Sequence, residues 1–216
     1  MTQTTNVLFE IGLEEMPARY MDATAAQLND KTEGWLQEIR LSYKQIKTFI
    51  TPRRIAVLIE ELQYKQDDQE EEAKGPAEKI AKDDSGNWSK AAIGFSKGQG
   101  KSVDDIYFKD VNGTKYVFVK KFIPGKTQTE LLPGFKDIIM NLSFPKTMRW
   151  KNHSFRFIRP IKWLVALQDE QVIPFEITGV STNNKTYGHR FLGEEIELND
   201  PLQYEALLEK QFVIAD

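Results

Sequence analysis

The sequence contains no cysteine and has only two histidines, His153 and His189. Without cysteine the chain cannot form disulfides, thiolate zinc sites or a cysteine nucleophile, and this absence agrees with a cytoplasmic location. A histidine-rich metal site also needs more histidines than the chain supplies. We therefore expect no metal and no cofactor bound by this chain.

Several recognisable segments are missing as well. The first residues, MTQTTNV, lack the basic and apolar regions of a signal peptide, and no apolar run approaches the length of a membrane span. The chain has no G-x-S-x-G elbow, H-E-x-x-H helix, dinucleotide-binding glycine pattern or phosphate-binding loop. These absences argue against a self-contained active site and against an ATP site. The net charge of −3 means that any contact with nucleic acid must come from a local patch.

Such a patch is present in the stretch from 144 to 191. No acidic residue occurs between Asp137 and Asp169, and aromatic residues alternate with cations there. The cations at the start of the stretch are Lys146, Arg149, Lys151, Arg156, Arg159 and Lys162, and the aromatics among them are Trp150, Phe155, Phe157 and Trp163. Cations contact phosphates and flat rings stack on bases. The alternative is a one-sided sheet whose aromatics point inward and whose cations point into water.

The hydrophobic pattern predicts an α+β protein with a mixed, largely antiparallel sheet and packed helices. The expected strands are 7–12, 46–50, 55–60, 104–109, 115–122, 155–158, 161–167, 172–180 and 195–198, and the expected helices are 17–39, 89–97, 127–142 and one from 201. Asn112-Gly113 lies between two alternating runs and predicts a hairpin. Thr127 and Glu130 have the spacing of a capping box, and Asn199 or Asp200 is expected to cap the last helix.

We expect three segments along the chain: a first β-α-β-β unit at 1–65, an acidic linker with a short helix at 66–100, and a second β-α-β-β unit with further strands and a C-terminal helix at 101–216. Glu60–Glu72 holds seven acidic residues and predicts a solvated or mobile segment. The same series of features occurs twice in the sequence: a strand, a helix, a Phe-Ile pair, a proline next to an arginine, and an apolar strand. It predicts two related halves, 7–60 and 115–168, packed as one body.

Charged residues next to turns are candidates for a site. Arg53 and Arg54 follow Pro52, where they are either solvated or form a fork that faces a phosphate. His189 and Arg190 follow a glycine and either contact a phosphate or order a loop. A catalytic role for the pair Glu14-Glu15 is the weaker interpretation, because acids near a helix N-terminus are favoured by the helix dipole alone.

Six motifs carry a resemblance to a known family: EIGLEEMPARY, FITPRRIAVLI, KAAIGFSKGQG, LSFPKTMRW, FIRPIKWLVAL and TYGHRF. In this order they resemble the β-subunit of bacterial heterotetrameric (α2β2) glycyl-tRNA synthetase, over residues 6–216. The chain departs from the family pattern at Met16, Lys151 and Lys162. The resemblance implies the N-terminal part of a β-subunit of a class II aminoacyl-tRNA synthetase, with ATP and Mg bound by a separate α-subunit. The implied partners are the glycyl-tRNA synthetase α-subunit and tRNA(Gly), with no membrane.

Three functions follow from these observations. In the first, the segment binds tRNA or the α-subunit. In the second, it is a purely structural module. In the third, it is a hydrolase in its own right, but the missing catalytic motifs argue against this function. The candidates for contact with tRNA or the partner are Arg53, Arg54, Lys146, Arg149, Trp150, Arg156, Arg159, His189 and Arg190. If their side chains are exposed, the RNA interpretation gains support. Burial of the same side chains against acids would favour the structural one.

Overall fold

The computed structural model describes residues 3–83, 85–150 and 154–215. It confirms the α+β class, with a mixed and largely antiparallel sheet. The chain separates into two compact units. Residues 1–66 and 126–216 form the first, here called the core unit, and residues 67–125 form the second, here called the inserted unit.

The core unit is built on a seven-stranded sheet with the order β2-β3-β1-β7-β10-β9, in which β8 pairs with β7. The strands are β1 (Thr4–Leu13), β2 (Gln45–Thr51), β3 (Arg54–Gln63), β7 (Ile161–Gln168), β8 (Gln171–Val172), β9 (Glu176–Ile177) and β10 (Val180–Asn183). All these strands pair antiparallel except β10, which runs parallel to β7.

Helices cover one face of this sheet. They are α1 (Met21–Glu38), α4 (Gln128–Leu131) and α5 (Phe135–Met140), with 3-10 turns at Ala18–Tyr20 and Leu132–Gly134. Side chains alternate along β1, so Val7, Phe9 and Ile11 point toward this layer. Phe9 stacks on Phe135 with ring centroids 3.8 Å apart. Pro133 interrupts the predicted helix 127–142 because its ring cannot sit inside a regular helix.

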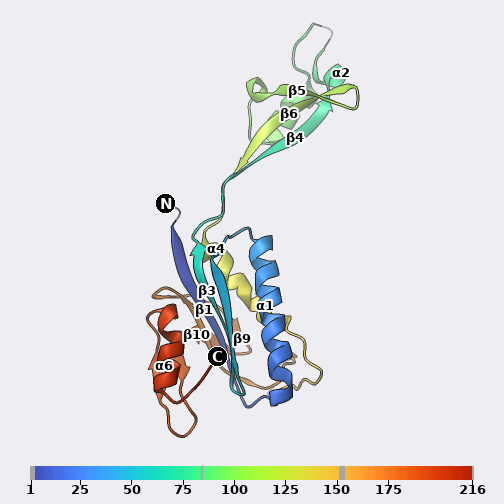
Figure 1. The fold of residues 1–216 in the computed structure, drawn as a ribbon. Helices are drawn as coiled ribbons and strands as arrows, with labels where there is room; N and C mark the ends of the chain where they lie inside the picture. Colours follow the sequence, from blue (N-terminus) through green and yellow to red (C-terminus); the bar gives the residue numbers. More distant parts are fainter. Residues whose placement is uncertain (1–2, 84, 151–153, 216) are drawn as a thin grey trace. The chain divides into compact units, whose positions relative to one another are not determined.

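The opposite face of the sheet is covered by a hairpin and a short helix. These are β11 (Lys185–Tyr187), β12 (Glu195–Glu197) and α6 (Tyr204–Lys210), which follows a 3-10 turn at Pro201–Gln203. Leu8, Leu58 and Leu167 pack here against Ile196 and Leu208. Figure 1 shows α1 and α6 on opposite sides of β1 and β3. Because both faces are covered, the central strands are almost continuously apolar in sequence.

The inserted unit is a three-stranded antiparallel sheet with two short helices. Its strands, in the order β4-β6-β5, are β4 (Gln69–Ala77), β6 (Thr114–Ile123) and β5 (Tyr107–Val111), and its helices are α2 (Glu78–Ala81) and α3 (Lys90–Gly98), with a 3-10 turn at Val103–Asp105. The hairpin at Asn112-Gly113 is confirmed, since both residues have positive φ, 56° and 80°, as the tight turn requires.

The acidic segment is largely folded into strands, and its residues from Asp67 to Glu72 are exposed, which agrees with the solvated alternative of the prediction. β3 extends to Gln63, and β4 begins at Gln69 and pairs with β6. This pairing places Glu70 3.1 Å from Lys120, and Glu72 lies 2.5 Å from Lys109 of β5. Glu70 and Glu72 are therefore paired with lysines of other strands, which a count of charges along the chain does not reveal.

The division of the chain also differs from the predicted segments 1–65, 66–100 and 101–216. Residues 101–125 belong with 67–100, because β6 is the central strand between β4 and β5. The prediction of two related halves is wrong for the same reason. In 7–60 all three strands share one sheet, whereas in 115–168 strand β6 lies in the inserted unit and β7 pairs with β1. A repeated order of local signals does not determine which strands pair.

The helix caps predicted from short-range sequence patterns are confirmed. The Thr127 N–H donates to the Glu130 carboxylate at 2.9 Å, which confirms the capping box, and the Leu202 N–H donates to Asp200 at 2.9 Å. Two predicted strands are different in the structure. In 155–158 there is a single bridge, between Met148 and Phe157, and 172–180 is broken into β8, β9 and the start of β10.

Candidate functional site

Four motifs that are far apart in the sequence meet at one end of the core-unit sheet: LEEMP (13–17), TPRR (51–54), IRPIKW (158–163) and TYGHRF (186–191). Backbone hydrogen bonds join them: Leu13 N–H to Arg53 O at 2.8 Å, Met16 N–H to Pro52 O at 2.7 Å, and Glu14 N–H to Pro160 O at 3.2 Å. The Arg54 side chain completes the connection by donating from Nη2 to the carbonyl of Tyr187 at 2.5 Å. We call this region the motif end.

A buried polar network lies beneath the motif end. Glu10 of β1 is fully buried, and its carboxyl group accepts the Trp163 Nε1–H at 2.5 Å and the Thr186 hydroxyl at 2.7 Å. Arg54, which is 1% exposed, donates from Nη1 to the same Thr186 hydroxyl at 3.4 Å. The hydroxyl thus links an acid and a base of opposite sign, and each offsets the cost of burying the other.

Tyr204 of α6 lies next to this network, but its buried hydroxyl has no hydrogen-bond partner among the described residues. Its ring is fully buried and makes an edge contact with Phe49, 5.4 Å between centroids. Burial raises the pKa of the Tyr204 hydroxyl well above its ordinary value, and the nearby Glu10 charge adds to the increase. The hydrogen bonds of the network connect β1, β3 and β7 of the sheet to β11, and the packing of Tyr204 against Phe49 adds α6 to the same layer.

At the surface of the motif end, the two adjacent acids are paired with cations. Lys162 Nζ lies 2.8 Å from Glu14, and Arg190 Nη1 lies 3.6 Å from Glu15. The hydrogen bond from Lys162 lowers the pKa of Glu14. A general acid requires the opposite shift, so this geometry does not favour the catalytic interpretation of Glu14-Glu15. Arg159 is also engaged, because its Nε donates to the Glu15 carbonyl at 2.8 Å.

Arg53 differs from its neighbours. Its side chain is half-buried, its guanidinium lies 5.8 Å from the centre of the Trp163 ring, and it lines each of three adjoining depressions at the motif end. Within the described part of the chain no ion pair involves Arg53. A guanidinium offers five hydrogen-bond donors, so Arg53 is available to an anionic group.

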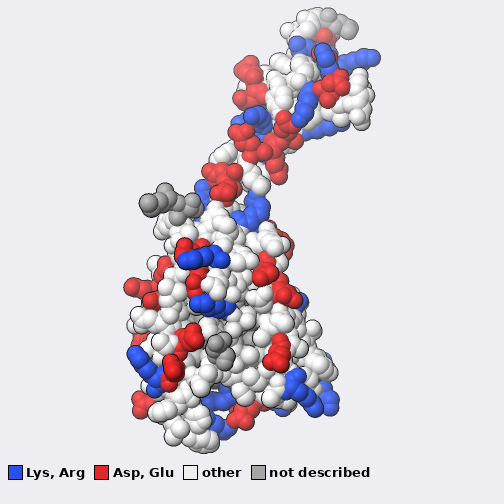
Figure 2. Space-filling view, in the orientation of Figure 1, with Lys and Arg blue, Asp and Glu red and all other residues white. Residues whose placement is uncertain are grey.

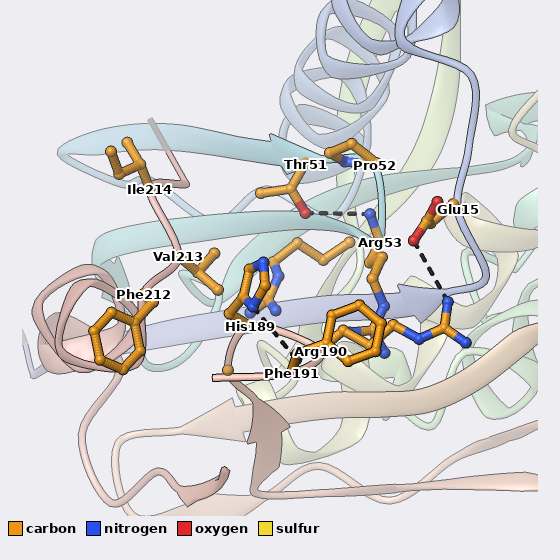
Figure 3. A pocket seen from close by; sticks show the side chains of 12 residues that line it. Glu15, Thr51, Pro52, Arg53, His189, Arg190, Phe191, Phe212, Val213 and Ile214 are labelled. Carbon is orange, nitrogen blue, oxygen red and sulfur yellow. Dashed lines mark hydrogen bonds and ion pairs between the residues drawn. The ribbon is translucent and has the colours of Figure 1, made fainter. Parts of the chain in front are cut away.

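The largest of these depressions is an open hollow of about 390 Å³. In Figure 3 the charged side chains of Glu15, Arg53 and Arg190 lie on one side of the hollow, and Phe212, Val213 and Ile214 lie on the other. His189 and Phe191 lie between the two groups, and the Phe191 N–H donates to His189 Nδ1 at 3.3 Å. The wall of the hollow is therefore part cationic and part apolar.

The acid-free stretch forms a separate surface. Met148 and Phe157 exchange backbone hydrogen bonds of 2.8 and 3.2 Å, which brings Arg149 and Arg156 beside each other. Both arginines are exposed, as is Lys146, and in the part of the chain that the structure describes none of the three has an ion-pair partner. Arg156 Nε donates to the Thr147 hydroxyl at 3.1 Å. We call Lys146, Arg149 and Arg156 the cationic loop.

The aromatic residues of this stretch point inward. Phe157 is fully buried, and Trp150 and Phe155 are half-buried against the core beneath α1. Trp150 meets Phe155 edge-on at 6.0 Å, and Phe155 stacks on Phe157 at 5.6 Å. The alternating pattern allowed two arrangements, and the structure has the one in which the aromatic side chains point inward and the cations lie in water. The loop consequently offers cations for phosphate contact, while its rings are engaged in the core.

On the face drawn in Figure 2, basic and acidic side chains are interspersed, with no single extended basic field. The described residues contain no cluster of three or more histidine, cysteine or acidic side chains that could hold a metal ion. Among the same residues, no helix is long and apolar enough to cross a membrane.

Comparison with known proteins identifies the family. A family model described as "Glycyl-tRNA synthetase beta subunit" matches residues 7–216. The chain belongs to this family. It is 55% identical over 209 residues to the glycine–tRNA ligase beta subunit of Halalkalibacterium halodurans and 54% identical over 211 residues to that of Bacillus subtilis. These alignments cover 97% and 98% of this chain but 30% and 31% of the two relatives. The chain spans about 30% of the length of the relatives it matches, in their N-terminal part.

Four of the six motifs that carry the family resemblance contribute residues to the motif end. The structure assigns different environments to the nine candidate contact residues. Lys146, Arg149, Arg156, His189 and Arg190 are exposed, Arg53, Trp150 and Arg159 are half-buried, and Arg54 is buried. The interpretation of Arg54 as half of a phosphate-facing fork is corrected, because β3 directs its side chain into the network under the surface. Lys151 and His153 lie outside the described residues.

Sequence reasoning missed three features of the site. Glu10 was overlooked, although a lone acid inside the apolar run VLFEIG signals a buried partner. Gly12 was read as the end of a strand, whereas it makes room for the Trp163 ring. The third feature is the exposure of Phe191, Phe212 and Ile214, because no sequence pattern distinguishes these apolar residues from those of the core.

Proposed function

We propose that this chain is the N-terminal region of the β-subunit of a glycine–tRNA ligase, where it binds the tRNA backbone and assembles with a catalytic partner subunit. In this proposal ATP and Mg are bound by that α-subunit, and the ligase acts in the cytoplasm. The family match and the beta-subunit names of the relatives support it. The candidate sites described above then serve binding and assembly, while aminoacylation takes place on the partner.

One observation carries the tRNA contact: the cationic loop presents two arginines side by side with no acid between them. Like charges in adjacent positions repel each other, so the arrangement is stabilised when an anion binds between them. Phosphate oxygens accept hydrogen bonds from guanidinium groups in this way. Because the neighbouring rings are packed inward, we expect contacts to the phosphate backbone and little reading of bases.

The triple variant Lys146→Ala, Arg149→Ala, Arg156→Ala tests this contact. Phosphate contacts release counterions, so the logarithm of the tRNA affinity falls linearly with the logarithm of the salt concentration. Each lost contact is expected to reduce the slope by about 1, and the triple variant by about 3. Fluorescence anisotropy with tRNA(Gly) between about 50 and about 200 mM salt measures the slope.

The matched control removes the same charge elsewhere. Lys90, Lys97 and Lys115 are exposed lysines of the inserted unit, and replacing them with Ala changes the net charge by the same amount. We expect the control variant to keep a slope close to that of the unmodified chain. Equal losses in both variants would contradict a localised contact. An unchanged slope in the cationic-loop variant would favour the second candidate function, a structural module whose charged motifs hold the fold.

The second candidate has its own supporting observation. Arg54 is enclosed in the buried network and Arg159 is bound to the Glu15 carbonyl, so two of the motif cations stabilise the chain itself. This observation concerns the motif end and does not extend to the cationic loop, whose three cations are exposed. The tRNA experiment therefore decides between the two functions.

A further inference from the structure

An apolar patch surrounds the hollow at the motif end. Phe191 is 83% exposed, Phe212 63% and Ile214 82%, although side chains of this size are usually buried in folded proteins. All three line the same hollow of about 390 Å³. Scattered exposed apolar residues need no explanation, but a group of them around one depression marks an interaction site.

The hollow also contains a cation that is available for a partner. Arg53 faces it from the side opposite Phe212 and Ile214, and no ion pair holds its guanidinium in the described structure. Arg190, by comparison, is 3.6 Å from Glu15. A half-buried guanidinium next to an apolar wall can bind a carboxylate whose neighbouring side chain is apolar. The apolar side chain packs on the wall and excludes water from the ion pair between the guanidinium and the carboxylate.

The same wall is poorly suited to RNA. Phe191 and Phe212 present rings on which bases can stack, but the rest of the wall, Val213 and Ile214, is aliphatic and offers no such surface. Glu14 and Glu15 lie beside Arg53 and Arg190, and Glu194 and Glu195 line the adjoining depression. Three of these carboxylates, Glu14, Glu15 and Glu195, offset the charges of Lys162, Arg190 and Lys185, so the region lacks the excess of positive charge that a phosphate backbone needs. A protein segment can instead contact the apolar wall. The chemistry of the hollow therefore favours a protein.

We propose that the hollow docks a segment of the partner subunit in which an apolar side chain is adjacent to an aspartate or glutamate. The apolar side chain packs between Phe191, Phe212 and Ile214, and the carboxylate pairs with Arg53. This inference rests on the proposed function, because the partner is the subunit implied by the beta-subunit family. It adds the surface, the residues and the chemistry of the contact.

The main test is the triple variant Phe191→Ser, Phe212→Ser, Ile214→Ser, titrated with the separately expressed α-subunit by calorimetry. Apolar anchors in a desolvated pocket dominate binding, so the dissociation constant is expected to rise roughly 30-fold or more. Arg53→Glu is expected to weaken binding as well, and Arg53→Lys less than Arg53→Glu. The control is Ile80→Ser with Phe122→Ser, two exposed apolar residues of the inserted unit, which is expected to leave the dissociation constant unchanged.

The readouts separate this inference from the proposed function. Docking at the hollow predicts that the triple serine variant loses the α-subunit but keeps the salt slope for tRNA, and that the cationic-loop variant does the reverse. Unchanged affinity for the α-subunit in the triple serine and Arg53→Glu variants overturns the docking proposal and leaves the tRNA proposal intact. Loss of tRNA affinity instead identifies RNA as the occupant, and loss of self-association in sedimentation identifies a second copy. Both of these results also overturn the proposal. Phe191, Phe212 and Ile214 are exposed and Arg53 is half-buried outside the ion pairs of the described residues, so a denaturation midpoint equal to that of the unmodified chain confirms that the variants are folded.

Discussion

Replacing Arg54 with methionine is expected to lower the free energy of unfolding by about 3–5 kcal/mol, the usual cost of removing one partner from a buried charged pair. The side chain is 1% exposed and donates to the Thr186 hydroxyl and the Tyr187 carbonyl. Methionine has a similar length but no donor, so it leaves the fully buried Glu10 without a nearby cation and the Tyr187 carbonyl without its partner. Urea denaturation followed by circular dichroism measures the change.

The neighbouring arginine provides a matched control. Arg53→Met removes the same side chain one residue earlier, from a half-buried position outside the ion pairs of the described residues, and is expected to cost less than about 1 kcal/mol. In the double variant Glu10→Gln, Arg54→Met the acid is neutralised as well, so the total loss is expected to be smaller than the sum of the single losses. Additive losses, or equal losses at positions 53 and 54, would contradict a coupled buried network.

A methyl group added at Gly12 is expected to destabilise the chain by about 1–3 kcal/mol, because it overpacks a closed site. Gly12 lies between Arg54 and Trp163 in the pairing of β1 with β3 and β7. A Cβ at this position would lie 1.9–2.4 Å from three atoms of the Trp163 ring. The ring is also held by its hydrogen bond to Glu10 at 2.5 Å. Gly12→Ala must therefore displace the indole or bend β1.

Unfolding by urea measures the cost of Gly12→Ala, and the fluorescence of the displaced tryptophan should shift to longer wavelength as water reaches it. Gly34→Ala is the control with the opposite sign. Gly34 lies inside α1, where an added Cβ meets no atom within 4 Å, so alanine is expected to stabilise the helix by about 0.5–1 kcal/mol. If Gly12→Ala were as stable as the unmodified chain, the close approach of Trp163 would not be what requires glycine there.

These two predictions concern residues whose roles depend on strand pairing, and this is where the sequence was least informative. Arg53 lies in the turn before β3 and Arg54 is the first residue of the strand, so strand pairing sets the direction of the Arg54 side chain only. Whether that side chain would be buried depends on the register of β3 against β1 and on the layer formed by β11 and α6. The alternation in 146–157 had the same ambiguity, and the structure resolved it with the rings inside and the cations outside.

The amino-acid sequence alone determined the α+β class, the family, the hairpin at Asn112-Gly113 and the helix caps at Thr127 and Asp200. Each of these features depends on residues that are close together in the chain or on several motifs that occur together, and both can be recognised in the sequence without the fold. Tertiary structure alone decided that β6 leaves the central sheet, that Arg54 is internal, and that Phe191 and Phe212 border one hollow. These outcomes depend on contacts between residues far apart in the chain, because burial and strand pairing are selected by the whole packed assembly.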